Sequence, residues 1–165
     1  MEYFIYVLSH TYTDEWHTDF KLLGFLNSLK SVEEMKKQAV ILPGFKEYSE
    51  GFVVNQYILD KIHWAEGFYK IIGEMGLDYL EKGDEVDKNC RSVKELKLNT
   101  IFSVSHYYTI DTHLDDERYI GVFSSLDQAE KAVEVLKMKP GFKTYPDCFD
   151  ISELDLNVLL WKSGF

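Results

Sequence analysis

The strongest constraint on the fold is a stretch of sequence that occurs twice. "PGFKEYSEGF" at 43–52 returns as "PGFKTYPDCF" at 140–149. The similarity extends upstream, where "SHTYTDEWH" at 9–17 corresponds to "SHYYTIDTH" at 105–113. The offset is 96 residues in the upstream stretch and becomes 97 after one inserted residue. Matches in one order at one spacing indicate a tandem duplication, because a fixed internal period marks a repeated structural unit.

The similarity also continues downstream of the duplicated stretch, to the end of each copy. Trp64 corresponds to Trp161, and Gly67-Phe68 corresponds to Gly164-Phe165. The segment between the two copies matches neither of them. We therefore predict three parts: a first repeat at 1–68, a connector at 69–99 and a second repeat at 100–165.

Each repeat carries the same predicted order of elements. Runs rich in aromatic and β-branched residues are typical of strands, and they stand at 3–12, 20–26 and 52–59 and again at 100–109, 118–123 and 149–156. Between the second and third runs, apolar residues recur at helical spacing. The sequence predicts an α+β fold of two tandem β-β-α-β repeats related by a pseudo-twofold axis. The sheets are mostly antiparallel with helices on one face, and either one shared sheet or two separate sheets satisfy the pattern.

Local signals place the ends of the two predicted helices. Ser28 or Ser31 can cap the first helix and Ser125 the second, since Ser at the N-cap accepts a backbone N–H bond. Pro43 and Pro140 stop the helices, and the glycine after each proline permits a sharp exit. "PGF…Y…F" is therefore interpreted as the corner between helix and third strand. Lone glycines at 24 and 121 indicate bulges or points of close approach.

These features resemble an uncharacterised family of small bacterial domains that usually hold one copy of this unit. The resemblance rests on "GVFSS" at 121–125, the two Pro-Gly-Phe corners and "HWAEGF" at 63–68. It implies the same fold and a bacterial or phage origin, and it implies no activity. The second repeat has Leu160 and Ser163 in place of His63 and Glu66, so the resemblance gives these two residues no role.

The sequence holds no motif of a known catalytic chemistry. It has no P-loop, dinucleotide fingerprint or nucleophile elbow, and its two cysteines form no metal or redox pair. Asp60, His63 and Glu66 resemble an acid/base cluster, but the second repeat replaces all three residues. We predict that the chain is not an enzyme and has no catalytic residues and no cofactor.

The duplicated histidines are the best candidates for metal binding. They are His10 and His17 in the first repeat and His106 and His113 in the second, and neighbouring carboxylates can complete a ligand set. The alternative is that His10 and His106 are hydrogen-bonded strand residues and that the other two lie in solvated loops. No spacing in the sequence defines a coordination geometry, and no metal site is predicted.

Charge points to a basic protein partner. The net charge is −10, and both repeats are acidic, which opposes binding to a phosphate backbone and attracts cationic proteins. The predicted hairpin loops concentrate this charge, and Trp16 supplies an aromatic anchor. The candidate partner-binding residues are Asp14, Glu15, Trp16, Asp19, Asp111, Asp115, Asp116 and Glu117.

The remaining features concern the location and the class of protein. No run of eighteen apolar residues predicts a membrane span, the first residues do not read as a secretory signal, and the cysteine usage suits a reducing cytoplasm. We therefore expect an acidic cytoplasmic protein-binding module, monomeric or homodimeric, that does not bind nucleic acid directly. The leading hypothesis is an immunity protein or antitoxin that covers the active cleft of a basic, nuclease-like toxin. The alternatives are a phage-encoded inhibitor of a host defence protein, and a protein that binds a metal or small ligand through the duplicated histidines.

Overall fold

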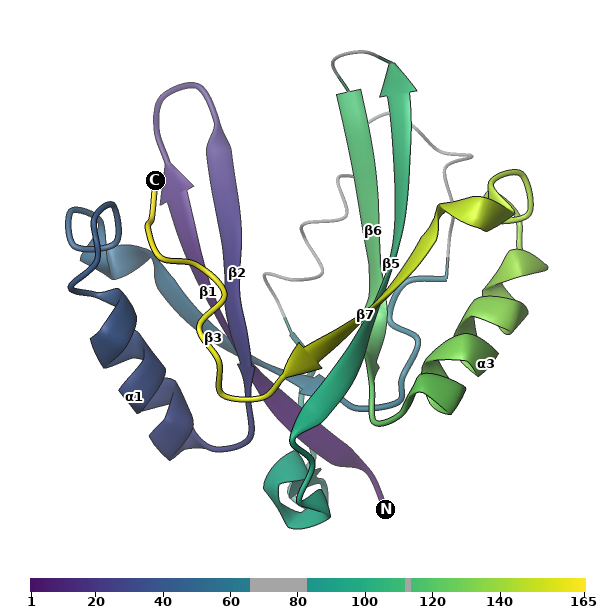
Figure 1. Cartoon of the computed structure of the whole chain (residues 1–165), viewed down its shortest axis with the longest axis horizontal. Coiled ribbons are helices and arrows are strands. Elements are labelled where there is room, and N and C mark those ends of the chain that lie inside the picture. The colour runs from purple at the N-terminus through teal and green to yellow at the C-terminus, as the bar shows by residue number, and fades with distance from the viewer. Residues whose placement is uncertain (66–82, 112–113) are drawn as a thin grey trace. The chain divides into compact units, whose positions relative to one another are not determined.

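The computed structural model describes residues 1–65, 83–111 and 114–165. The described chain has an α+β fold with two mainly antiparallel sheets of four and three strands (Figure 1). It divides into two compact units. Unit 1 comprises Met1–Ile58, Asp84–Asn99 and Asp155–Phe165, and unit 2 comprises Leu59–Gly83 and Thr100–Leu154. The predicted fold class is confirmed, and of the two sheet arrangements that the sequence allowed, the chain has separate sheets.

Unit 1 is built on the sheet order β2-β1-β3. Its elements are β1 (Tyr3–Thr13), β2 (Thr18–Leu26), α1 (Leu29–Ala39) and β3 (Phe52–Ile58). β1 is antiparallel to both of its long neighbours, and the short strand β4 (Arg91–Ser92) runs parallel to the start of β1. Short 3-10 helices at Ser49–Gly51 and Val93–Leu96 complete the unit.

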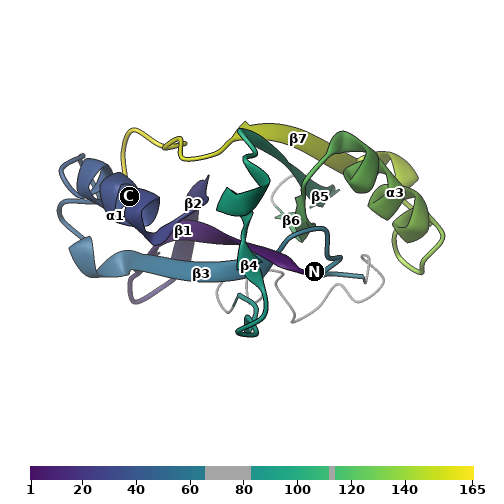
Figure 2. The same ribbon diagram turned by 90° about the horizontal axis from the view of Figure 1, so that it is seen from below.

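Unit 2 repeats this order on the sheet β6-β5-β7. Its elements are β5 (Thr100–Asp111), β6 (Leu114–Phe123), α3 (Leu126–Lys137), a 3-10 turn at Pro146–Cys148 and β7 (Phe149–Asp155). β5 and β6 form an antiparallel hairpin. In both units the helix covers one face of its own sheet (Figure 2).

The helix ends follow the local sequence signals. The Ser28 side chain accepts a hydrogen bond from the backbone N–H of Ser31, which makes Ser28 the N-cap of α1. Ser125 caps α3 in the same way through the N–H of Gln128. After each helix the chain turns at a glycine with positive φ, +84° at Gly44 and +85° at Gly141, a conformation in which a side chain is strained.

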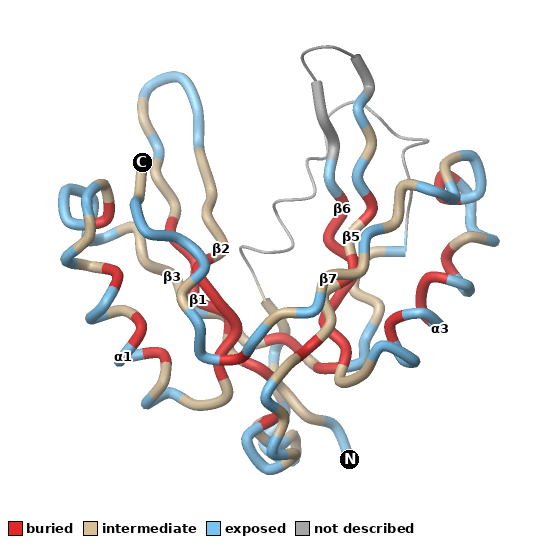
Figure 3. The backbone as a smooth tube through the Cα atoms, in the orientation of Figure 1, coloured by how far each residue is buried: buried red, intermediate tan, exposed pale blue. Residues whose placement is uncertain are grey.

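Each unit has its own apolar core between helix and sheet (Figure 3). In unit 1 the buried cluster consists of Leu8, Leu23, Leu26, Val32, Met35, Ala39 and Phe45. In unit 2 it consists of Val104, Ile120, Phe123, Ala129, Ala132, Val133, Leu136 and Phe142. The phenylalanine of each Pro-Gly-Phe corner is fully buried, so the repeated corner supplies a core side chain as well as a turn.

The two strand glycines lie beside irregularities in the hairpins. The β1–β2 register shifts next to the pair Leu8–Gly24, and the β5–β6 register shifts next to Val104–Gly121. A Cβ at Gly24 would lie 2.7 Å from the carbonyl oxygen of Val158. The interpretation of these glycines as bulges and points of close approach is confirmed.

The segments that follow β3 and β7 do not stay with the strands that precede them. We call residues 59–65 tail 1 and residues 156–165 tail 2. Tail 1 pairs with β6 through Asp60 N–H to Val122 C=O (2.9 Å). Tail 2 pairs with β2 through Asn157 N–H to Phe25 C=O (2.8 Å). Each tail therefore completes the compact unit that is built mainly from the other predicted repeat.

Candidate functional site

The β1–β2 hairpin presents four of the residues that the sequence singles out. Its turn is organised by Asp14, whose carboxylate accepts the backbone N–H groups of Trp16 (2.8 Å) and His17 (2.9 Å). The Asp14 N–H also donates to the His17 carbonyl (3.0 Å). These backbone bonds lower the pKa of the Asp14 carboxyl below its usual value, because they stabilise its charged form. Asp14 therefore stabilises the conformation of the turn and also contributes a negative charge to it.

His17 joins two acidic side chains at the same tip. Its Nδ1 lies 2.9 Å from Asp14, and its Nε2 lies 3.1 Å from an oxygen of Asp19. All three side chains remain accessible to solvent. The bridging imidazole keeps the two carboxylates within one small patch, although they lie on opposite sides of the turn.

Trp16 is the most exposed large apolar side chain in the described residues, with 88% of its surface accessible. The neighbouring Glu15 is also exposed. The tip consequently displays an indole ring within a group of acidic side chains. We call Asp14, Glu15, Trp16 and Asp19 the acidic tip.

The matching hairpin of unit 2 is described only in part. Asp115 pairs with Thr109 and Asp116 with Tyr108 in the β5–β6 ladder, and Glu117 is exposed. The side chains of Asp111, Asp115 and Asp116, and the whole of residues 112–113, lie outside the described part of the structure. Of the eight predicted partner-binding residues, the structure brings together the four of the acidic tip.

The strand histidines are core residues. His10 and His106 are fully buried, and their Nε2 atoms lie 2.7 Å and 2.8 Å from the carbonyl oxygens of Tyr48 and Tyr145. A carbonyl only accepts, so each Nε2 carries the proton and donates it. This geometry agrees with the alternative of hydrogen-bonded strand residues. In the described residues, no group of three His, Cys, Asp or Glu side chains can hold a metal ion, and His113 lies outside them.

Two tyrosine pairs beside these histidines were not anticipated from the sequence. The rings of Tyr12 and Tyr48 lie 4.4 Å apart, and those of Tyr108 and Tyr145 lie 4.0 Å apart. A hydrogen bond within each pair raises the pKa of Tyr12 and of Tyr108. All four residues are matched between the two predicted repeats, so the internal sequence similarity contained a signal for these pairs.

The cluster around Asp60 has a structural role in unit 2. The Asp60 carboxylate accepts the backbone N–H of Ser124 (2.7 Å) and the Ser124 hydroxyl (2.8 Å). In unit 1, the Asn157 side chain accepts the N–H of Asn27 (3.1 Å) in the same manner. An Asn side-chain oxygen accepts a backbone N–H as an Asp carboxylate does, so both residues can make this hydrogen bond. Glu66 lies outside the described residues.

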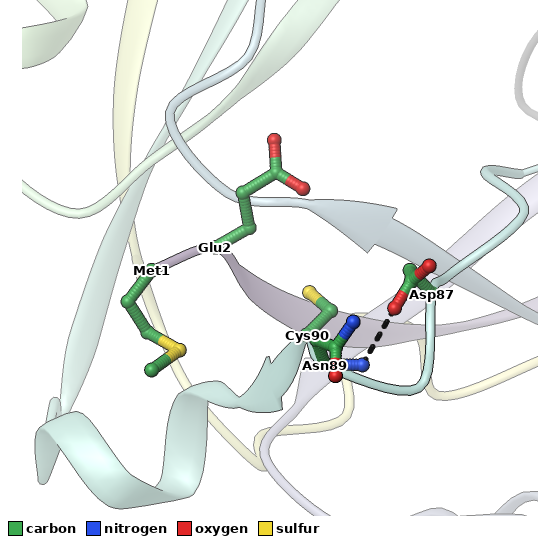
Figure 4. A pocket seen from close by; sticks show the side chains of 5 residues that line it. All are labelled: Met1, Glu2, Asp87, Asn89 and Cys90. Carbon is green, nitrogen blue, oxygen red and sulfur yellow. Dashed lines mark hydrogen bonds between the residues drawn. The ribbon is translucent and has the colours of Figure 1, made fainter.

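A surface pocket of about 310 Å³ opens near the first residues of the chain (Figure 4). Its lining consists of Met1, Glu2, Asp87, Asn89 and Cys90. The Asn89 N–H donates to the Asp87 carboxylate (2.7 Å), and burial raises the pKa of the Cys90 thiol. A protonated thiol is a weak nucleophile and a weak metal ligand. The pocket therefore does not favour a nucleophilic or metal-binding role for Cys90.

Comparison with protein families gives a match in the second half of the chain. Residues 99–165 are similar to a domain of unknown function, DUF7336. The matched region contains β5, β6, α3, β7 and tail 2, which agrees with the expected resemblance to an uncharacterised domain family. The comparisons with curated proteins and with solved structures each gave no match. Within the described residues, no helix is long and apolar enough to cross a membrane.

Proposed function

We propose that the chain is a protein-binding module that docks a basic partner through the acidic tip. The observation that carries this proposal is Trp16, a large apolar side chain held in solvent among carboxylates. Tryptophan is enriched among residues that dominate binding energy. The surrounding acids add long-range attraction for a cationic surface.

The geometry of the hairpin also supports a docking role. The three hydrogen bonds of the Asp14 turn, together with the His17 contacts, link the residues of the tip to one another. A surface that is ordered before binding loses less conformational entropy when a partner arrives. The acidic tip is thus preorganised, with its aromatic anchor already presented.

In its most concrete form, the proposal is an immunity protein or antitoxin that acts in the cytoplasm. A net charge of −10 allows the chain to compete with nucleic acid for the cationic cleft of a nuclease-like toxin. A phage-encoded inhibitor of a nucleic-acid-binding defence protein would use the same surface. The described positions of His10 and His106 favour neither a metal nor a small-ligand function.

Trp16→Ala tests this proposal. We expect the variant to lose about 30-fold or more in affinity for the physiological partner, since truncating a hot-spot residue costs at least about 2 kcal/mol. Its free energy of unfolding should stay within about 0.5 kcal/mol of wild type, because the side chain packs against little. The partner is captured from the source cells at low salt, and its affinity is then measured by titration calorimetry.

Ile41→Ala is the matched control, because Ile41 is also a large exposed apolar residue (73%) but belongs to the segment after α1 and not to the hairpin. It should bind like wild type. Glu15→Lys should weaken binding more at low salt than at high salt, because salt screens exposed charges. A partner that binds Trp16→Ala and wild type equally well would rule out the acidic tip as the docking site.

A further inference from the structure

Tail 2 is held in unit 1 along its whole length. Its backbone donates from Leu160 to Leu23 C=O (2.9 Å) and from Gly164 to Pro43 C=O (2.7 Å), in addition to the bond from Asn157. The Lys21 ammonium donates to the carbonyl oxygen of Gly164 (2.8 Å). These contacts are spread over eight residues, so tail 2 is attached to unit 1 at several points and not at one.

Aromatic side chains add to this attachment. The Lys21 Nζ lies 4.5 Å from the centre of the Trp161 ring and 4.6 Å from that of Phe165, within the range of a cation–π interaction. The Phe165 ring stacks near His10 and Tyr12, with centroid distances of 5.8 Å in both cases. Phe165, the last aromatic residue of the tail, therefore packs beside the rings of His10 and Tyr12 in unit 1.

The receiving surface has no room for larger residues at two positions. A Cβ at Gly24 would lie 2.7 Å from the Val158 carbonyl oxygen, and a Cβ at Gly44 would lie 2.5 Å from the Gly164 carbonyl carbon. Both clashes are with backbone atoms, which cannot move without displacing the tail. We call this surface the tail socket; it consists of Lys21, Leu23, Gly24, Phe25, Pro43 and Gly44.

Unit 2 contains the equivalent arrangement for tail 1. His63 N–H donates to Ile120 C=O (2.8 Å), and a Cβ at Gly121 would meet the Lys61 carbonyl oxygen. The Arg118 guanidinium lies 4.8 Å from the Trp64 ring. Each of these contacts has a counterpart in unit 1 between residues at an offset of 97. The two tails are therefore attached by the same set of contacts.

Near its start, each tail turns at a residue with positive φ. Asn157 has φ of +64° and Asp60 has φ of +61°, a left-handed conformation that Asn and Asp tolerate better than most residues. Asn157 follows β7, and tail 2 then docks in unit 1 rather than in the unit that contains most of β7. Exchange of an identical element between protomers is a low-cost route to dimers, and a terminal segment that docks outside the unit of the strand before it is suited to such an exchange.

We propose that the tail socket also accepts tail 2 of a second copy of this chain, so that the protein forms arm-exchanged dimers. None of the contacts above depends on which chain the tail belongs to. Within one chain the tail has a high effective concentration, which favours the monomer in dilute solution. Exchange is expected when tails are released and docked again at high protein concentration. This proposal is independent of the acidic tip.

Complementary full-length variants provide the test. The socket variant, Lys21→Glu/Gly24→Val, retains its tail but cannot receive one. The tail variant, Trp161→Ala/Gly164→Val, retains its socket but has no competent tail. We expect each variant alone to be monomeric and an equimolar mixture at about 100 μM to form a heterodimer, measured by size-exclusion chromatography with light scattering. A chain with all four substitutions is the control and should pair with neither variant.

Two further measurements keep the test decisive. A synthetic peptide of residues 155–165, DLNVLLWKSGF, should bind the tail variant and compete with the heterodimer, and it should bind wild type at least 10-fold more weakly because that socket is occupied. If a variant does not fold, wild type refolded at about 1 mM should contain dimers that are absent after refolding at about 1 μM. Mixtures of folded variants that stay monomeric, or wild type that refolds only to monomer at both concentrations, would overturn the proposal.

Discussion

Replacing Phe45 by alanine is expected to lower the free energy of unfolding by about 3–5 kcal/mol, the usual cost of truncating a buried phenylalanine. Phe45 is fully buried, and its ring contacts those of His10 (centroids 5.0 Å apart) and Phe52 (5.8 Å). Alanine would leave a cavity at the point where the helix, the corner and the sheet meet. The loss should appear in urea denaturation followed by circular dichroism.

Ile41→Ala is the control for this measurement as well, because Ile41 lies only four residues away but is mostly exposed. It should change the free energy of unfolding by about 0.5 kcal/mol or less. Phe142→Ala, the matched substitution in unit 2, should have an effect similar to that of Phe45→Ala. If Phe45→Ala cost no more than the control, the Pro-Gly-Phe corner would not be a core element.

Gly24→Val is expected to destabilise the chain by about 1–3 kcal/mol, the usual range for forcing extra atoms into a packed site. In an open strand the same substitution would help, since valine favours strands and glycine weakens them. The sign reverses here because a Cβ at Gly24 would collide with the carbonyl oxygen of Val158. Met35, the other neighbour, is a flexible side chain that can adjust.

A double-mutant cycle separates the effect of the collision with tail 2 from the effect of Gly24→Val on the rest of unit 1. A chain shortened to end at Asn157 lacks the carbonyl that collides with the atoms added by Gly24→Val. In that chain, the loss of unfolding free energy caused by Gly24→Val should be smaller than in the 165-residue chain by at least about 1 kcal/mol. Residues in direct contact show coupling energies of this size. The free energies are obtained from urea denaturation of all four proteins. Equal costs in the long and the shortened chain would show that tail 2 does not dock beside Gly24.

The elements that sequence reasoning located correctly are those fixed by neighbouring residues. These elements are the serine caps, the helix ends before the prolines, and the turns at Gly44 and Gly141. Each depends on interactions within a few residues, so the local sequence is enough to predict it. The predicted repeat added a check, because each predicted element had to fit two different stretches of sequence. The hydrogen bonds of His10 and His106 agree with one of the two alternatives that the sequence left open, that of hydrogen-bonded strand residues.

The tail arrangement was beyond such reasoning. Leu160 donates to Leu23, a residue 137 positions earlier in the sequence. The second repeat offers an equivalent acceptor at Ile120, and sequence similarity cannot distinguish between two matching surfaces. The predicted repeats at 1–68 and 100–165 group residues by similarity, whereas the compact units group them by contact. The two divisions differ at the tails and at the predicted connector, where Asp84–Asn99 belong to unit 1.

The candidate site was predictable in composition but not in geometry. The acids and Trp16 of the first hairpin were visible as residue types in a polar loop. That Asp14 accepts two backbone N–H groups, and that His17 lies between two carboxylates, depends on the conformation of the turn. The full exposure of the Trp16 ring follows from the same conformation and could not be read from its neighbours in sequence.

Tail 1 belongs to unit 2 and tail 2 to unit 1, and scalar couplings across hydrogen bonds can detect this arrangement in solution. Such couplings connect the amide nitrogen of a donor with the carbonyl carbon of its acceptor in NMR spectra of isotope-labelled protein. We expect them between Leu160 and Leu23 and between His63 and Ile120, where the donor–acceptor distances are 2.9 Å and 2.8 Å. Couplings that instead join Leu160 to Ile120 and His63 to Leu23 would show each tail docked on its own repeat and would contradict this arrangement.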